Sequence, residues 1–124
     1  MRRLLIISLP LLLAGCTGEQ STDDWLRQLK DPDVVKRRQA IRALGIRMTD
    51  AERVTPPLSE ALQDANGYVR HDAALTLGKL GPTAKMAVPA LVAALKDKER
   101  GVRKAAGQAL KKIDPKGASK AGER

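Results

Sequence analysis

The chain has 124 residues, which is the length of one domain at most. It carries 23 Lys and Arg against 14 Asp and Glu, a formal net charge of +9 at pH 7, so its surface favours anionic partners. One cysteine excludes an intrachain disulfide, and one histidine excludes a site that needs two imidazole ligands.

Residues 1–15 have the layout of a secretory signal. Two arginines follow Met1, an apolar run extends from Leu4 to Leu13, and two small residues close the segment. The run is shorter than the roughly 20 apolar residues of a membrane span, and Pro10 in its middle is unfavourable in a helix. The pattern therefore predicts a cleaved signal peptide, with an uncleaved anchor helix as the alternative.

The segment Leu13-Ala14-Gly15-Cys16 resembles the lipobox of bacterial lipoproteins. The resemblance implies that the Cys16 thiol receives a diacylglyceryl group, that the chain is cut before Cys16, and that the new amino group is acylated, as with palmitate. Two or three acyl chains hold a protein stably on a membrane, whereas one does not. We therefore expect an exported protein that is lipid-anchored to the membrane through Cys16. In a Gram-negative source, Thr17 in place of the Asp that retains lipoproteins in the inner membrane implies the outer membrane, facing the periplasm.

An offset of 33 residues aligns the remaining sequence with itself. The coinciding pairs are Leu58 and Leu91, Ala61 and Ala94, Leu62 and Leu95, Asp64 and Asp97, Arg70 and Arg103, Ala73 and Ala106, and Leu77 and Leu110. A further step back gives a less regular copy that contains Leu29, Asp31, Arg37, Ala40 and Leu44 in phase. Chance matching in a chain rich in Ala and Leu would not keep Asp and Arg in phase through three copies.

The period predicts repeats at about 23–49, 50–82 and 83–115, which together form one domain over 23–115. A flexible polar tether at 16–22 precedes this domain, and a disordered basic tail at 116–124 follows it.

Each repeat has the apolar periodicity of two helices. The predicted helices are 22–30, 33–47, 55–64, 67–80, 86–96 and 99–113. Pro56 and Pro89 fall where a first helical turn tolerates proline. Trp25 is predicted to cover the core at the end of the stack, with ligand stacking on its ring as the alternative. One repeat cannot bury its apolar face alone, so the sequence predicts an all-α fold, an α-solenoid of about three helix pairs.

Asp followed six residues later by Arg, then Ala three residues on and Leu beyond, resembles the HEAT repeat, in the short form found in phycobilin lyases. The resemblance covers about residues 23–115 and implies a structural ladder, in which carboxylates bond backbone and arginine groups between neighbouring repeats. The ladder residues would be Asp31, Arg37, Asp64, Arg70, Asp97 and Arg103. The planar arginine fork suits carboxylate pairing, so we expect these charges to be structural. The chain is much shorter than the lyases, so their chromophore attachment is not carried over.

The candidate partner-binding surface consists of exposed positions on the second helices of the repeats. It forms a basic stripe of Arg38, Arg42, His71, Lys79, Lys104 and Lys112. The resemblance to HEAT repeats places second helices on the concave face of the stack, where solenoids bind partners. The alternative left open is an ordinary solvated face.

We expect no enzyme, because the sequence has no second histidine, no nucleophile beside a base, and no Gly-rich phosphate loop. Accordingly, no catalytic residue, metal, cofactor or small-molecule substrate is predicted. Nucleic acid is not expected as a partner because the protein is predicted to be exported. The sequence indicates a membrane-tethered adaptor of the bacterial cell envelope that binds an acidic protein on its basic concave face. The alternative is a binder of anionic envelope polymer or lipid head groups, which would release its ligand far more steeply with salt.

Overall fold

The computed structural model describes residues 18–122, and the regular elements within this range are all helical. In chain order they are α2 (Thr22–Gln28), α3 (Val34–Leu44), the 3-10 helix η1 (Met48–Asp50), α4 (Ala51–Ala61), α5 (Gly67–Leu80), the 3-10 helix η2 (Gly81–Ala87), α6 (Val88–Ala94), α7 (Arg100–Ile113) and α8 (Pro115–Gly122). No helix within residues 18–122 combines the length and apolar character needed to cross a membrane. The predicted signal peptide and Cys16 lie outside the described residues.

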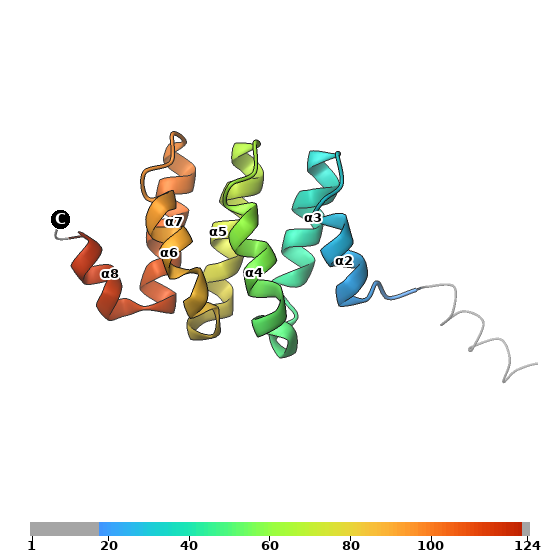
Figure 1. Cartoon of the computed structure of the whole chain (residues 1–124), viewed down its shortest axis with the longest axis horizontal. Coiled ribbons are helices and arrows are strands. Elements are labelled where there is room, and N and C mark those ends of the chain that lie inside the picture. The colour runs from blue at the N-terminus through green and yellow to red at the C-terminus, as the bar shows by residue number, and fades with distance from the viewer. Residues whose placement is uncertain (1–17, 123–124) are drawn as a thin grey trace, which may run out of the picture.

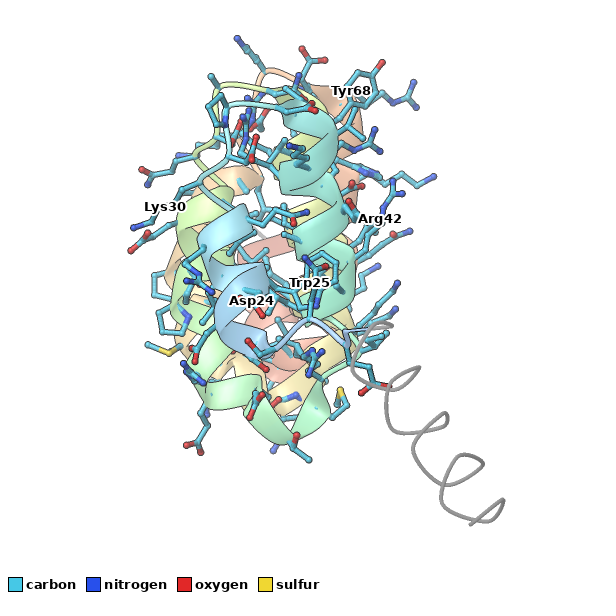
Figure 2. The ribbon with its side chains drawn as sticks, turned by 90° about the vertical axis from the view of Figure 1, so that its right-hand side faces the viewer. Asp24, Trp25, Lys30, Arg42 and Tyr68 are labelled. Carbon is cyan, nitrogen blue, oxygen red and sulfur yellow. The ribbon has the colours of Figure 1, made fainter. Side chains whose placement is uncertain are left out.

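The helices stand in pairs that follow one another along a single axis (Figure 1). Viewed along that axis, the first helices α2, α4 and α6 form one layer, and the second helices α3, α5 and α7 form the other (Figure 2). Leu44, Leu58, Leu77 and Leu91 are fully buried in the core. Because α3 packs on α5 and α5 on α7, each repeat buries the apolar face of its neighbour. The prediction of an all-helical stack of helix pairs is confirmed over the described residues.

Two glycines allow the second helices to approach one another closely. A Cβ added to Gly45 of the α3 end would lie 2.7 Å from Thr76 Cγ2 of α5. A Cβ added to Gly78 of α5 would lie 3.1 Å from Ala109 Cα of α7. These positions are 33 residues apart, so the absence of a side chain at equivalent positions sets the distance between second helices at both interfaces.

Helix α4 begins earlier than predicted. It starts at Ala51 in place of residue 55, so Pro56 and Pro57 lie inside the helix and not in its first turn. Ala51 and Val54 are buried in the core, and this burial offsets the backbone hydrogen bonds that the prolines cannot make. Pro89 does lie in the first turn of α6, where proline is favourable.

The tail predicted to be disordered forms helix α8 over residues 115–122. The Asp114 side chain accepts a hydrogen bond from the Gly117 N–H at 3.0 Å. The Asp114 carbonyl accepts another from the Ala118 N–H at 2.9 Å, and Ala118 packs against the core. These contacts order a segment whose composition alone predicts disorder.

Trp25 lies at the N-terminal end of the stack, between α2 and α3 (Figure 2). Its ring is half-buried and packs against the core. Helix α2 is fixed there by a capping box, in which Ser21 and Asp24 satisfy each other's backbone N–H groups. This position covers the otherwise open apolar end of the first repeat.

Candidate functional site

The second-helix face is the exposed side of α3, α5 and α7, and it carries the six residues of the predicted basic stripe. Residues at intervals of 33 form columns across the three helices, such as Arg38, His71 and Lys104. Figure 2 shows Arg42 and Tyr68 on this side of the stack and Lys30 on the opposite side. The sequence-predicted residues therefore share one face.

A buried carboxylate lies beneath part of this face. Asp72 is only 6% exposed, and its Oδ2 accepts a hydrogen bond from Arg38 Nε at 2.7 Å. Arg42 Nη2 lies 3.3 Å from the same oxygen, and His71 Nδ1 lies 3.6 Å from Asp72 Oδ1. The hydrogen bond to Asp72 raises the pKa of the Arg38 guanidinium above its ordinary value, although burial opposes the rise.

Asp72 was not among the site residues predicted from the sequence. Asp72 stands in register with Gln39 and Ala105, and Ala105 is buried. Gln39 of the same column is exposed, so the repeat pattern alone does not predict that Asp72 is buried. Once buried, an ionised side chain requires a cationic partner. Arg38 and Arg42, four residues apart on the neighbouring helix, were the available candidates.

Tyr68 is a second contact of Arg38. The Arg38 Cζ atom lies 5.3 Å from the centre of the Tyr68 ring, which is a cation–π distance. Tyr68 itself remains 68% exposed. Arg38 thus contacts both a ring and a carboxylate, and it shares that carboxylate with Arg42.

The lysines of the stripe differ from its arginines. Lys79, Lys104 and Lys112 are exposed, and within residues 18–122 none of them forms an ion pair. The predicted basic stripe therefore has two parts. Arg38, Arg42 and His71 surround Asp72, whereas the three lysines are available to a partner.

A hollow of about 440 Å³ opens between the N-terminal ends of α5 and α7. Its lining consists of Asn66, Gly67, Tyr68, His71, Glu99, Gly101 and Val102. Gly101 stands in the same column as Val35 and Tyr68, so the absence of a side chain there leaves the space open. Glu99 adds a carboxylate to an otherwise basic surface.

The ladder residues pair between repeats at the turns that join first and second helices. Arg37 Nε lies 2.9 Å from Asp64 Oδ2, and Arg70 Nε donates to Asp97 Oδ2 at the same distance. Each arginine also donates through Nη1 to the backbone carbonyl of the aspartate in its own repeat; the acceptors are Asp31 for Arg37, Asp64 for Arg70 and Asp97 for Arg103. Each ladder arginine thus clamps its own turn, and Arg37 and Arg70 also hold the next repeat.

Burial and hydrogen bonding have opposite effects on the pKa of the ladder residue Asp97. Burial raises the pKa of its carboxyl group, but hydrogen bonds from Arg70 and from the Glu99 N–H hold the pKa below the ordinary value. The carboxylate is therefore ionised and oriented. Between Gly18 and Gly122, no group of three His, Cys, Asp or Glu side chains has the arrangement of a metal site.

Comparisons of this chain with protein families and with solved structures both gave matches. A model of HEAT repeats matches residues 22–111, which include α2 and most of α7. The chain is also similar to a chain in the solved complex of CpcE and CpcF of phycocyanin lyase from Nostoc sp. PCC7120, with 31% sequence identity and a TM-score of 0.73. That match covers 84% of this chain and 41% of the other, so this chain spans less than half of its relative. The search of curated proteins gave no match. From the repeat match over most of its length, the chain belongs to the HEAT-repeat family.

Proposed function

We propose that this protein is a lipid-anchored adaptor of a bacterial cell envelope, which holds an acidic protein through the lysines of its second-helix face. HEAT repeats form extended scaffolds for protein partners, and the similar solved structure is itself a complex of two proteins. The acidic partner is inferred from Lys79, Lys104 and Lys112. These side chains are exposed and form no ion pair with another described residue. Such unpaired cations attract and orient an anionic surface.

The test is in-cell crosslinking followed by mass spectrometry, on the wild type and on Lys79→Glu/Lys104→Glu. The matched control is Lys30→Glu/Lys96→Glu, which makes the same charge change at exposed positions of one column outside the second-helix face. We expect one protein to be captured by the wild type and by the control, and lost from the first variant. Equal capture by all three chains would contradict a site on this face.

The lipid anchor has its own test, because Cys16 lies outside the described residues. The proposal predicts that labelled palmitate enters the wild-type chain and that the chain sediments with membranes. Cys16→Ser should abolish labelling and leave the signal peptide uncleaved. A Cys16→Ser chain that is labelled and cut normally would contradict the lipoprotein hypothesis.

A second candidate function is binding to anionic envelope polymer or lipid head groups. It is favoured by α7, which carries five cations and no acidic residue between Arg100 and Ile113. Binding of the purified chain to vesicles of anionic lipid should fall steeply between low and physiological salt if this candidate holds. A packed protein interface depends far less on salt.

The proposed role includes no catalytic step. His71, the one imidazole of the chain, lies beside a carboxylate that two arginines already bind. The chain spans 41% of the chain that it resembles in the phycocyanin lyase complex, so we do not extend lyase activity to it. We expect the purified protein to have no visible absorbance, and a bound pigment would reopen the question of lyase activity.

A further inference from the structure

One arginine of the ladder, Arg103, has no carboxylate partner among the described residues. In the first two repeats, Arg37 and Arg70 each hold an aspartate of the following repeat. Arg103 occupies the same position in the third repeat, and within residues 18–122 no carboxylate pairs with it. In Figure 1 only α8 lies beyond α7, beside the end of α7 that is far from the turn at Asp97.

The Arg103 guanidinium is nevertheless oriented like the other two. Its Nη1 donates to the Asp97 carbonyl at 2.7 Å and to the Lys98 carbonyl at 3.1 Å. The corresponding distances for Arg70 are 2.7 Å and 3.2 Å. These bonds fix the plane of the guanidinium, so Nε and Nη2 of Arg103 present the fork that in Arg70 holds a carboxylate at 2.9 Å and 3.2 Å. A fork already oriented in this way binds a carboxylate with less loss of side-chain entropy.

The charge around Arg103 favours an anionic occupant. Besides Arg103, α7 carries Arg100, Lys104, Lys111 and Lys112, all exposed, and the one carboxylate within four residues of Arg103 along the sequence is Glu99 at the N-cap of the helix. None of these four side chains forms an ion pair with another described residue. Unpaired positive charge is therefore concentrated on the helix that presents the open fork.

Lys111 disfavours a further helix pair packed like the described ones. It stands 33 residues after Gly78 and 66 after Gly45, the two glycines that let one second helix approach the next. A lysine at this position keeps another second helix from packing at the same short distance. A further second helix, whether of this chain or of a second copy, would have to pack against α7 at a greater distance than α5 does.

From these observations we infer that the exposed end of α7 is a docking site for an acidic protein segment, with Arg103 binding one of its aspartate or glutamate carboxylates through both Nε and Nη2. The inference rests on the proposed function, because it identifies where the acidic partner is held most specifically. Lys104 and Lys111 attract the segment, whereas the fork of Arg103 fixes one carboxylate in place.

The probe is a fluorescent peptide, Glu-Gln-Asp-Ala-Asn-Gly-Glu, which copies the turn at Asp64 between two glutamates. Its binding to the full-length chain in non-ionic detergent is measured by anisotropy at low salt. Arg103→Gln should weaken binding at least about fivefold, and Arg103→Lys, which keeps the charge but loses the fork, about threefold or more. Lys104→Gln removes the same charge next to the fork and should weaken binding less than about twofold. A peptide with Asn in place of its central Asp should bind the wild type as weakly as the Asp peptide binds Arg103→Gln.

Equal losses in Arg103→Gln and Lys104→Gln would overturn the inference, because diffuse attraction would then explain binding. Sedimentation of the chain as an oligomer that Arg103→Gln dissociates would also overturn it, by placing a second copy at the fork. Failure of the adaptor proposal can be distinguished from failure of the docking site at Arg103. If the peptide binds through Arg103 but no cellular protein is captured, the docking site stands without the proposed function. If a captured partner is lost in Lys79→Glu/Lys104→Glu but retained in Arg103→Gln, the adaptor proposal is supported and the docking site at Arg103 is contradicted.

Discussion

The guanidinium of Arg70 holds the carboxylate of Asp97, 27 residues further along the chain, through Nε at 2.9 Å and Nη2 at 3.2 Å. The side chain of Arg70 is 7% exposed and that of Asp97 11%. The same guanidinium also donates to two backbone carbonyls of its own turn. One side chain therefore fixes both a turn within a repeat and the position of the next repeat.

Arg70→Ala should accordingly destabilise the stack. It leaves the Asp97 carboxylate partly buried without its counter-ion, which costs about 3 kcal/mol of unfolding free energy. Arg103→Ala is the matched control, because Arg103 makes the same turn contacts without the contact to another repeat. Thermal unfolding followed by circular dichroism should show a much larger fall in Tm for Arg70→Ala. Equal falls would mean that the turn contacts, and not the pairing between repeats, stabilise the structure.

Acid should weaken the same contact. The pKa of Asp97 is lower in the folded protein than its ordinary value of 3.8, so between the two values the unfolded chain binds more protons than the folded one. The stabilisation is therefore present above pH 3.8 and is lost as the pH falls through the folded pKa. Urea unfolding at a series of pH values should show that Asp97→Asn loses less stability on acidification than the wild type. An identical dependence on pH in both proteins would assign the acid sensitivity to other carboxylates.

How far the sequence could predict this structure depended on whether a feature repeats. The 33-residue phase predicts the second helices and places Asp64 and Asp97, and likewise Arg70 and Arg103, at equivalent positions of successive repeats. It could not reveal features that occur once. To predict the partners of Asp72, one must know which face of α5 packs against α3. To predict that α4 continues through Pro56, one must know that Ala51 is buried. These features arise from packing between repeats, which local propensity does not encode.

Asp72 limits the positive charge of the second-helix face, so its neutralisation should strengthen binding to an anion. Asp72→Asn releases Arg38 and Arg42 from their shared carboxylate. We expect affinity for poly-L-glutamate at low salt to rise about threefold. Glu60→Gln removes the same charge from an exposed position on α4 and is the control for total charge. If both variants gain equally, net charge alone governs binding and the position of Asp72 is irrelevant.

Two glycines on the second helices should respond to alanine in opposite directions. At Gly78, an added Cβ would lie 3.1 Å from Ala109 Cα and 3.3 Å from Ala109 Cβ, so Gly78→Ala must separate α5 from α7 and should cost about 1 to 3 kcal/mol. At Gly107, the first neighbour of an added Cβ is Leu95 Cδ2 at 3.7 Å, an ordinary contact. Gly107→Ala should therefore stabilise the protein by up to about 1 kcal/mol, since alanine favours the helix. Urea unfolding of both variants measures the two changes. A stabilising Gly78→Ala would show that the second helices tolerate a wider spacing, and that Lys111 does not disfavour another repeat at the end of α7.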